Sequence, residues 1–169
     1  AQSTRAVAIE AARFLPAGIP LIACAKGIEQ GTGLLQSEIL DAVLPGHPSG
    51  ALSGPSFAAD VASGLPTAIV LALEDGALAH AVASSLSSGY LRLYASDDVR
   101  GVQIGGALKN IIAIAVGICR GGKLGASAEA ALVARGYAEI QRVGLALGMK
   151  PETLNGLSGL GDLFLTCSS

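Results

Sequence analysis

Short apolar runs alternate with segments of helical periodicity over the first 96 residues of the chain. The run TAIVLAL at 67–73 is continuous and apolar, which predicts a buried strand. Shorter runs at 20–25, before Ser53 and at 90–94 predict three more strands. Helical spacing predicts helices that start near Ser3 and cover 34–43, 57–62 and 76–86. Because strands alternate with helices, we predict a parallel sheet covered by helices.

The pattern changes after Ser96, where two long helical segments replace the alternation. Residues 99–119 form one apolar segment, and 126–147 form another with apolar residues at three- and four-residue spacing. No strong strand pattern follows. We therefore expect an α/β unit at 1–96 and an all-α unit at 97–169.

Composition narrows the class of protein. With 51% hydrophobic and 14% charged residues, the 169-residue chain can bury a core and is not a charge-rich, disordered one. The 11 basic and 13 acidic residues give a net charge of −2 without a long basic run, so we expect no nucleic-acid partner. The apolar run 111–119 is shorter than the about 18 residues that span a bilayer, so we expect no transmembrane segment. Three cysteines without a CxxC pair indicate a reduced, intracellular protein.

Two predicted strand ends carry residues suited to binding. Lys26 directly follows the run 20–25, and ligands of parallel sheets bind beyond the carboxyl ends of the strands. A lysine there can reach a phosphate or a carbonyl oxygen, although a solvated loop lysine has the same position. In SGPSFA at 53–58, Gly54 lets backbone approach a ligand, and free amides at the next helix start favour an anion. A plain strand-to-helix turn with a serine cap fits this segment equally well.

Lys109 is the only charged residue between Arg100 and Arg120, in a helical segment that also contains Gly105 and Gly106. Glycines inside a helix cost about 1 kcal/mol each relative to alanine, so a close approach of backbone or ligand is expected there. A buried lysine at this position would have a lowered pKa and would suit general acid–base catalysis. A lysine that reaches water from the helix edge is the alternative.

Asp162 is the only charged residue after Glu152. It is either the N-cap of a helix or the hydrogen-bond partner of a lysine amine. Thr166 lies four residues later, so a helix would place both side chains on one face.

The segment 117–123 matches the GxxxxGK part of a P-loop, which makes a nucleotide-binding domain built on Gly117 to Lys123 the alternative function. Leu124, however, occupies the Ser/Thr position that would hold Mg²⁺, and the segment continues a helix. A non-catalytic helical interaction module, in which Lys109 is dispensable, is a third hypothesis. His47 and His80 lie apart from each other and from the cysteines, so we expect no metal site.

Six segments together resemble the bacterial type of NAD(P)-dependent glycerol-3-phosphate dehydrogenase. They occur in that family's order and spacing: ACAKGIE (23–29), SGPSFA (53–58), GLPTAIVLA (64–72), GGALKNIIAIAVGI (105–118), AALVARGYAEIQRVGLALG (130–148) and PETLNGLSGLGDLFLTC (151–167). The resemblance implies part of an NAD(P)-binding Rossmann domain at 1–96 and part of a helical, 6-phosphogluconate-dehydrogenase-like substrate domain at 97–169. It also implies reduction of dihydroxyacetone phosphate to sn-glycerol 3-phosphate with NADH or NADPH, in the cytoplasm, for glycerophospholipid synthesis.

The resemblance further implies roles for eight residues. Lys109 is the proton donor and acceptor, and Asp162 orients both Lys109 and the substrate. The other contacts are Lys26 with substrate and cofactor, Gly54 and Ser56 with substrate, Ala58 with cofactor, and Asn110 and Thr166 with the substrate phosphate.

Three departures accompany the resemblance. The family's glycine-rich pyrophosphate loop should precede residue 1, and its Ser-Arg-Asn phosphate segment should follow Ser169. The turn from Arg120 to Leu124 stands where relatives carry an acidic, glycine-rich turn. We therefore expect a chain that lacks both ends and that, alone, shows no turnover and weak NADH binding. The choice between NADH and NADPH and the oligomeric state, including a homodimer, stay open.

Overall fold

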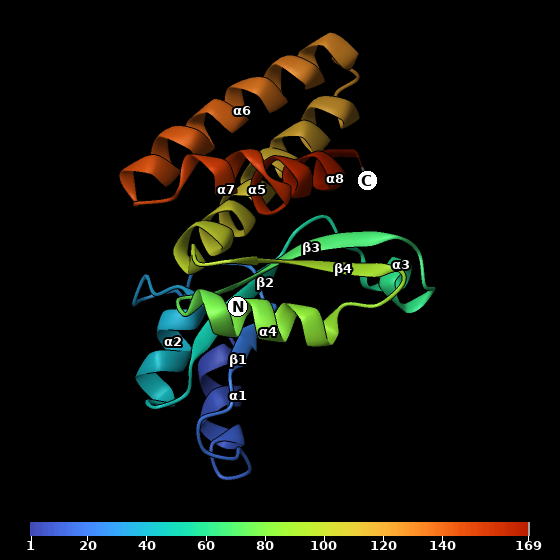
Figure 1. Ribbon diagram of the computed structural model, residues 1–169. Coiled ribbons are helices and arrows are strands. Elements are labelled where there is room, and N and C mark those ends of the chain that lie inside the picture. The colour runs from blue at the N-terminus through green and yellow to red at the C-terminus, as the bar shows by residue number, and fades with distance from the viewer. Residues whose placement is uncertain (169) are drawn as a thin grey trace.

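The computed structural model describes residues 1–168, in which a four-stranded sheet is followed by a helical unit (Figure 1). The strands are β1 (Leu21–Ala23), β2 (Ser49–Ser53), β3 (Thr67–Leu73) and β4 (Leu91–Ser96). The helices of the sheet unit are α1 (Thr4–Ala11), α2 (Gln36–Val43), α3 (Ala58–Ala62) and α4 (Gly76–Leu86). The helical unit contains α5 (Val99–Gly121), α6 (Ala126–Ala146), α7 (Pro151–Asn155), the π-helical turn η1 (Leu157–Gly161) and α8 (Asp162–Ser168).

The sheet is mixed, so the expectation of an all-parallel sheet is wrong. β1 and β2 pair in parallel, as do β3 and β4, but β2 and β3 are antiparallel, with Ala51 opposite Ala72. A parallel connection needs a crossover, usually a helix that packs on a face of the sheet. The link from β2 to β3 instead carries the five-residue α3, which lies beyond the strand ends (Figure 1). The chain therefore turns back beside β2, a reversal that the alternation of strands and helices does not reveal.

Both faces of β3 are covered, by α4 on one side and α5 on the other. Ile69, Leu71 and Leu73 belong to an apolar cluster that includes residues of α4. Ala72, which points to the opposite face, packs with β2 and with Val102 near the start of α5. α5 therefore begins on the sheet and runs away from it into the helical unit (Figure 1). This course places the middle of α5 at the junction of the two units.

From the short apolar run 111–119 we expected no membrane-spanning helix. The whole of α5, however, is long and apolar enough to cross a bilayer by length and composition. A core helix meets the same criteria. The buried residues of α5 include Val102 and Ile104, and its later turns contribute Val116 to the apolar core shared with α6 and α8. We therefore interpret α5 as the central helix of the fold.

The change from sheet to helices falls between Ser96, the end of β4, and Val99, the start of α5. The backbone there is fixed by Asp98, whose carboxylate accepts hydrogen bonds from Gly101 N and Lys150 N, both at 2.9 Å. The assignment of 1–96 to the cofactor and of 97–169 to the substrate stays a prediction.

Candidate active site

The carboxylate of Asp162 lies between the ammonium groups of Lys26 and Lys109. Lys26 Nζ lies 2.5 Å from Oδ2, and Lys109 Nζ donates to Oδ1. Asp162 is 1% exposed and Lys109 is 7% exposed, so the pair is buried. The three residues come from the loop after β1, from the middle of α5 and from the start of α8. Folding thus gathers them where the sheet meets the helical unit.

Thr166 completes the surroundings of Lys109. Lys109 Nζ donates to Thr166 Oγ1 at 2.7 Å, and that hydroxyl donates to the main-chain oxygen of Asp162, also at 2.7 Å. Asp162 and Thr166 are four residues apart in α8, so the expectation that they share one helix face is confirmed. Of the two interpretations left open for Asp162, the structure supports the lysine partner, because the carboxylate faces the two ammonium groups.

Burial lowers the pKa of the Lys109 ammonium, because a charged amine is poorly solvated between packed helices. Asp162 opposes this effect through its hydrogen bond and its charge, whereas the positive charge of Lys26 lowers the pKa further. Lys109 therefore gives up its proton more readily than a lysine in water. The alternative, a lysine that reaches solvent from the helix edge, is wrong for this chain.

Lys26 also approaches the end of β2, where its Nζ lies 3.4 Å from the main-chain oxygen of Gly54. Gly54 has φ of +151°, and a Cβ there would lie 3.0 Å from Ile69 Cα. This position therefore requires glycine, both for its backbone conformation and for the close packing on β3. The structure thus brings together two of the residues that the sequence analysis singled out on separate strand ends.

Ser56, Ala58 and Asn110 lie outside this cluster. Ser56 is half-buried just after Gly54, Ala58 is the exposed first residue of α3, and Asn110 is exposed next to Lys109. Within residues 1–168, none of the three side chains forms a hydrogen bond to Lys26, Lys109 or Asp162. Their roles toward substrate and cofactor stay predictions, as do those of the other site residues.

The sequence analysis missed two features of the site. It did not predict the contact of Asp162 with Lys26, because no sequence signal links Lys26 to a residue 136 positions away. It also missed Ser53, a buried residue whose Oγ has no hydrogen-bond partner among the described residues. A Cβ at Gly106 would lie 3.0 Å from Ser53 Oγ and 3.3 Å from Lys26 Cδ, so the aliphatic part of Lys26 crosses α5 at this glycine.

The glycine pair in α5 is explained by close approach, as expected. A Cβ at Gly105 would lie 2.8 Å from the main-chain oxygen of Ser158 in η1, which cannot yield as a flexible side chain would. We expect Gly105→Ala to lower the free energy of unfolding by about 1–3 kcal/mol through overpacking. Gly117→Ala is the matched control: it lies in the same helix with no atom within 4 Å, so the change should raise stability by about 0.5–1 kcal/mol. Urea denaturation measures both values, and equal shifts would contradict the contact with η1.

The segment 117–123 does not form a P-loop, so the alternative of a nucleotide-binding domain built on it is wrong. Gly117 to Gly121 form the last turns of α5, and Lys123 follows in a turn with φ of +54°. A P-loop instead connects a strand to the start of a helix, which exposes its amides to phosphate. Arg120 of this segment pairs with Glu129 on α6 at 3.1 Å and so joins two helices.

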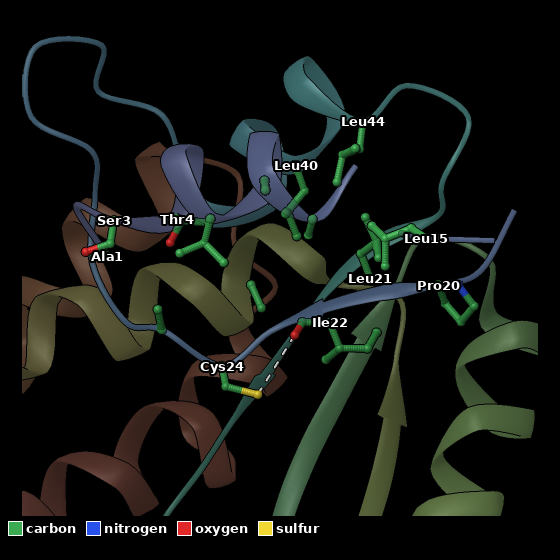
Figure 2. Close-up of a pocket in the computed structure, with 15 residues that line it drawn as sticks. Ala1, Ser3, Thr4, Leu15, Pro20, Leu21, Ile22, Cys24, Leu40 and Leu44 are labelled. Carbon is green, nitrogen blue, oxygen red and sulfur yellow. Dashed lines mark hydrogen bonds between the residues drawn. The ribbon is translucent and has the colours of Figure 1, made fainter. Parts of the chain in front are cut away.

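An apolar groove lies between α1, β1 and α2 (Figure 2). The side chains of Leu15, Leu21, Leu40 and Leu44 line it, and the Cys24 thiol lies at one end, 3.9 Å from the main-chain oxygen of Ile22. None of its described lining residues has a charged side chain, and burial raises the pKa of the Cys24 thiol at its end. The lysine–carboxylate cluster is therefore the candidate active site.

The loop that carries Lys26 is tied to α1 by an ion pair. Arg5 Nε and Nη2 donate to the two carboxylate oxygens of Glu29 at 2.9 and 2.7 Å, and the Thr32 hydroxyl donates to the same carboxylate at 2.5 Å. These hydrogen bonds lower the pKa of Glu29 to about 2, and the bond from Arg5 has the larger effect.

A depressed pKa makes this link sensitive to acid. The unfolded chain protonates Glu29 near pH 4.5, so its contribution to stability is complete above that pH and is lost as the pH falls towards 2. We expect Glu29→Gln to be less stable than the unchanged protein at neutral pH, with a difference that shrinks through this window. Urea denaturation at several pH values measures it, and a difference independent of pH would argue against the ion pair.

Two sequence models of one family match the chain. The model described as NAD-dependent glycerol-3-phosphate dehydrogenase N-terminus matches residues 1–79, and the corresponding C-terminus model matches residues 98–169.

Individual relatives agree with this match. The chain is 60% identical over 169 residues to the glycerol-3-phosphate dehydrogenase (NAD(P)+) of Mesorhizobium japonicum, covering 100% of the chain and 49% of the relative. It is 60% identical over 166 residues to that of Azorhizobium caulinodans, covering 98% and 51%. The crystal structure of glycerol-3-phosphate dehydrogenase from Coxiella burnetii matches with a TM-score of 0.92 and 39% identity, over 99% of this chain and 51% of that one. The chain thus spans about half the length of the curated relatives it matches.

A Rossmann-like mixed sheet that continues into a helical unit places the chain in the class of two-part Rossmann-like proteins, with lysines and a carboxylate at the junction. Within that class, the chain belongs to the NAD-dependent glycerol-3-phosphate dehydrogenase family. The family resemblance seen in the sequence is confirmed.

Proposed function

We infer that the protein containing this chain reduces dihydroxyacetone phosphate to sn-glycerol 3-phosphate with NADH or NADPH. The observation that carries this proposal is the buried Lys109 ammonium, which Asp162 and Thr166 hold in one orientation beside Lys26. The names of the relatives, which are glycerol-3-phosphate dehydrogenases, support the choice of substrate.

The residues present fit anionic ligands such as a phosphorylated ketone and a dinucleotide. Two lysines share one carboxylate, so the cluster retains one uncompensated positive charge. The side chain of Lys26 is 25% exposed and that of Lys109 only 8%, so Lys26 is the lysine that a ligand reaches first. A bound nicotinamide cofactor would supply the hydride for the reduction.

Lys109 performs the proton chemistry in this proposal. When a ketone carbon accepts hydride, negative charge develops on its oxygen, and an ammonium within hydrogen-bond distance stabilises that charge and then donates its proton. The lowered pKa of Lys109 favours this donation. Asp162 and Thr166 accept hydrogen bonds from the same nitrogen, which fixes the direction of its remaining hydrogen.

The pH dependence of the two reaction directions tests this role. Reduction needs the protonated amine and should decline as the pH rises through a value below 10.5, the ordinary pKa of lysine. Oxidation of glycerol 3-phosphate needs the neutral amine and should increase over the same range. The complete protein is assayed by NAD(P)H absorbance with and without dihydroxyacetone phosphate, and the product is identified. Absence of substrate-dependent NAD(P)H oxidation would overturn the proposed function.

We also place this reaction in the cytoplasm, as a source of glycerol 3-phosphate for glycerophospholipid synthesis. Cys24, Cys119 and Cys167 are free, which supports a reducing compartment. A homodimer stays a prediction, which sedimentation of the purified protein would test.

A further inference from the structure

α2 begins with two consecutive polar residues that are both buried. Gln36 is 0% exposed and Ser37 is 6% exposed, although the first turn of a surface helix usually faces water. Burial of a polar side chain is unfavourable unless its hydrogen bonds are replaced. The partners of these two side chains therefore indicate what this helix end holds in place.

Gln36 holds the loop that carries Lys26. Its Nε2 donates to the main-chain oxygen of Gly27 at 2.8 Å, and its Oε1 accepts from Thr4 Oγ1 at 2.5 Å. Gly27 directly follows Lys26 and has φ of +135°, and a Cβ there would lie 3.0 Å from Ala1 Cβ. The amide of Gln36 thus fixes the carbonyl of a residue whose backbone conformation and close packing require glycine, next to the lysine.

Ser37, the next residue, is hydrogen-bonded to α5. Its main-chain nitrogen donates to Gln103 Oε1 at 2.9 Å, and its Oγ accepts from Gln103 Nε2 at 2.7 Å. Gln103 is itself 7% exposed and lies in α5, six residues before Lys109. One turn of α2 is therefore bonded both to the Lys26 loop and to the helix that carries Lys109.

We propose that Gln36 is a positioning residue for Lys26, and that with Ser37 and Gln103 it sets the Lys26 loop in a fixed position relative to α5. This rests on the proposed function, in which both lysines face the substrate. A lysine has a long, flexible side chain, so the place its ammonium reaches depends on where its backbone is held. The two ammonium groups also repel each other, so the contacts with Asp162 do not by themselves fix the distance between the backbones.

The central test compares a variant that removes the whole Gln36 amide with a variant that removes only one of its two hydrogen-bond partners. Gln36→Met removes the donor to the Gly27 carbonyl and should lower kcat/KM for dihydroxyacetone phosphate by about 10- to 100-fold, as displacement of a substrate-contacting group does. Thr4→Val removes only the bond to Gln36 Oε1 and should stay within about 3-fold of the unchanged protein, since the bond to Gly27 remains. Equal kcat/KM for Gln36→Met and the unchanged protein would overturn the proposal.

A second pair of variants guards against simple unfolding. Glu38→Ala removes the acceptor of the Leu35 main-chain nitrogen, at 2.7 Å, and so weakens the same helix turn without touching Gly27. Gly27→Ala displaces the carbonyl while leaving Gln36 intact, and should reproduce the kinetic loss of Gln36→Met. The kinetics are compared at a temperature at which Glu38→Ala, Gln36→Met and Gly27→Ala are all folded. If Glu38→Ala then loses as much kcat/KM as the other two variants, the role of Gln36 is structural and the proposal fails.

Hydrogen exchange separates failure of this proposal from failure of the proposed function. Gln36→Met should speed amide exchange in residues 25–33 of the complete protein, whether or not it reduces dihydroxyacetone phosphate. If the unchanged protein is inactive while exchange increases, the proposed function fails and the control of the Lys26 loop by Gln36 stands. Unchanged exchange in this segment overturns the proposal in either case.

Discussion

Lys109→Met should lower kcat for the reduction of dihydroxyacetone phosphate by about 10²–10⁴-fold, the range that a positioned general acid contributes. Lys109 is 7% exposed, and methionine keeps most of its volume while removing the ammonium that contacts Asp162 and Thr166. Because the loss falls on proton transfer, kcat should decrease more than the affinity for NADH. Steady-state kinetics and NADH fluorescence titration measure the two effects.

The matched control is Lys123→Met, which makes the same chemical change at an exposed lysine in the turn after α5. Its kcat should stay close to that of the unchanged protein. If Lys109→Met retained full activity, Lys109 would not be the proton donor and the proposed proton chemistry would be wrong.

Asp162→Asn should lower the free energy of unfolding by about 3–5 kcal/mol, because it leaves two neighbouring ammonium groups without their shared counter-charge. Asparagine has the same shape, so packing is preserved and the loss comes from charge. The loss should become smaller as the pH rises towards 10.5, the ordinary pKa of lysine, because burial lowers the pKa of Lys109 and its ammonium loses its charge below that pH. Reductive activity should fall as well, since the orientation of Lys109 depends on this carboxylate.

Asp97→Asn provides the comparison at an exposed ion pair. Asp97 Oδ1 lies 2.6 Å from Lys150 Nζ, but the two side chains are 59% and 45% exposed, so solvent screens the pair and the loss should be much smaller than that of Asp162→Asn. Urea denaturation at neutral pH and near pH 10 measures both variants. Similar losses for Asp162→Asn and Asp97→Asn would show that the buried cluster has no special dependence on its carboxylate.

The elements with the clearest physical signals could be predicted from the sequence. The strand at 67–73 is buried on both faces and therefore reads as an unbroken apolar run, and the helix at 76–86 begins where Asp75 accepts hydrogen bonds from two main-chain nitrogens. The direction of β3 could not be predicted, because the five-residue α3 leaves the same sequence pattern as a short crossover helix.

The candidate site, too, could be predicted only in part. The four-residue spacing predicted that Asp162 and Thr166 share one helix face, whereas Lys109 as the partner of Asp162 was implied only by the family resemblance. The second partner of Asp162, Lys26, depends on how the sheet unit packs against the helical unit, which local pattern does not encode. Gln36 was missed for a related reason, since a glutamine at a helix start is ordinarily solvated and only tertiary packing buries it.

Asp162 belongs to the same structural unit as Lys109, whereas Lys26 extends to it from the sheet side. A motion that parted the sheet from the helices would stretch the contact of Asp162 with Lys26 first and leave the contact with Lys109 whole. Under the proposed function, Lys109 would then keep its alignment in an open form, and only Lys26 would lose its contact. Substrate binding by Lys26 and proton transfer by Lys109 would thus depend on opposite sides of the junction between sheet and helices.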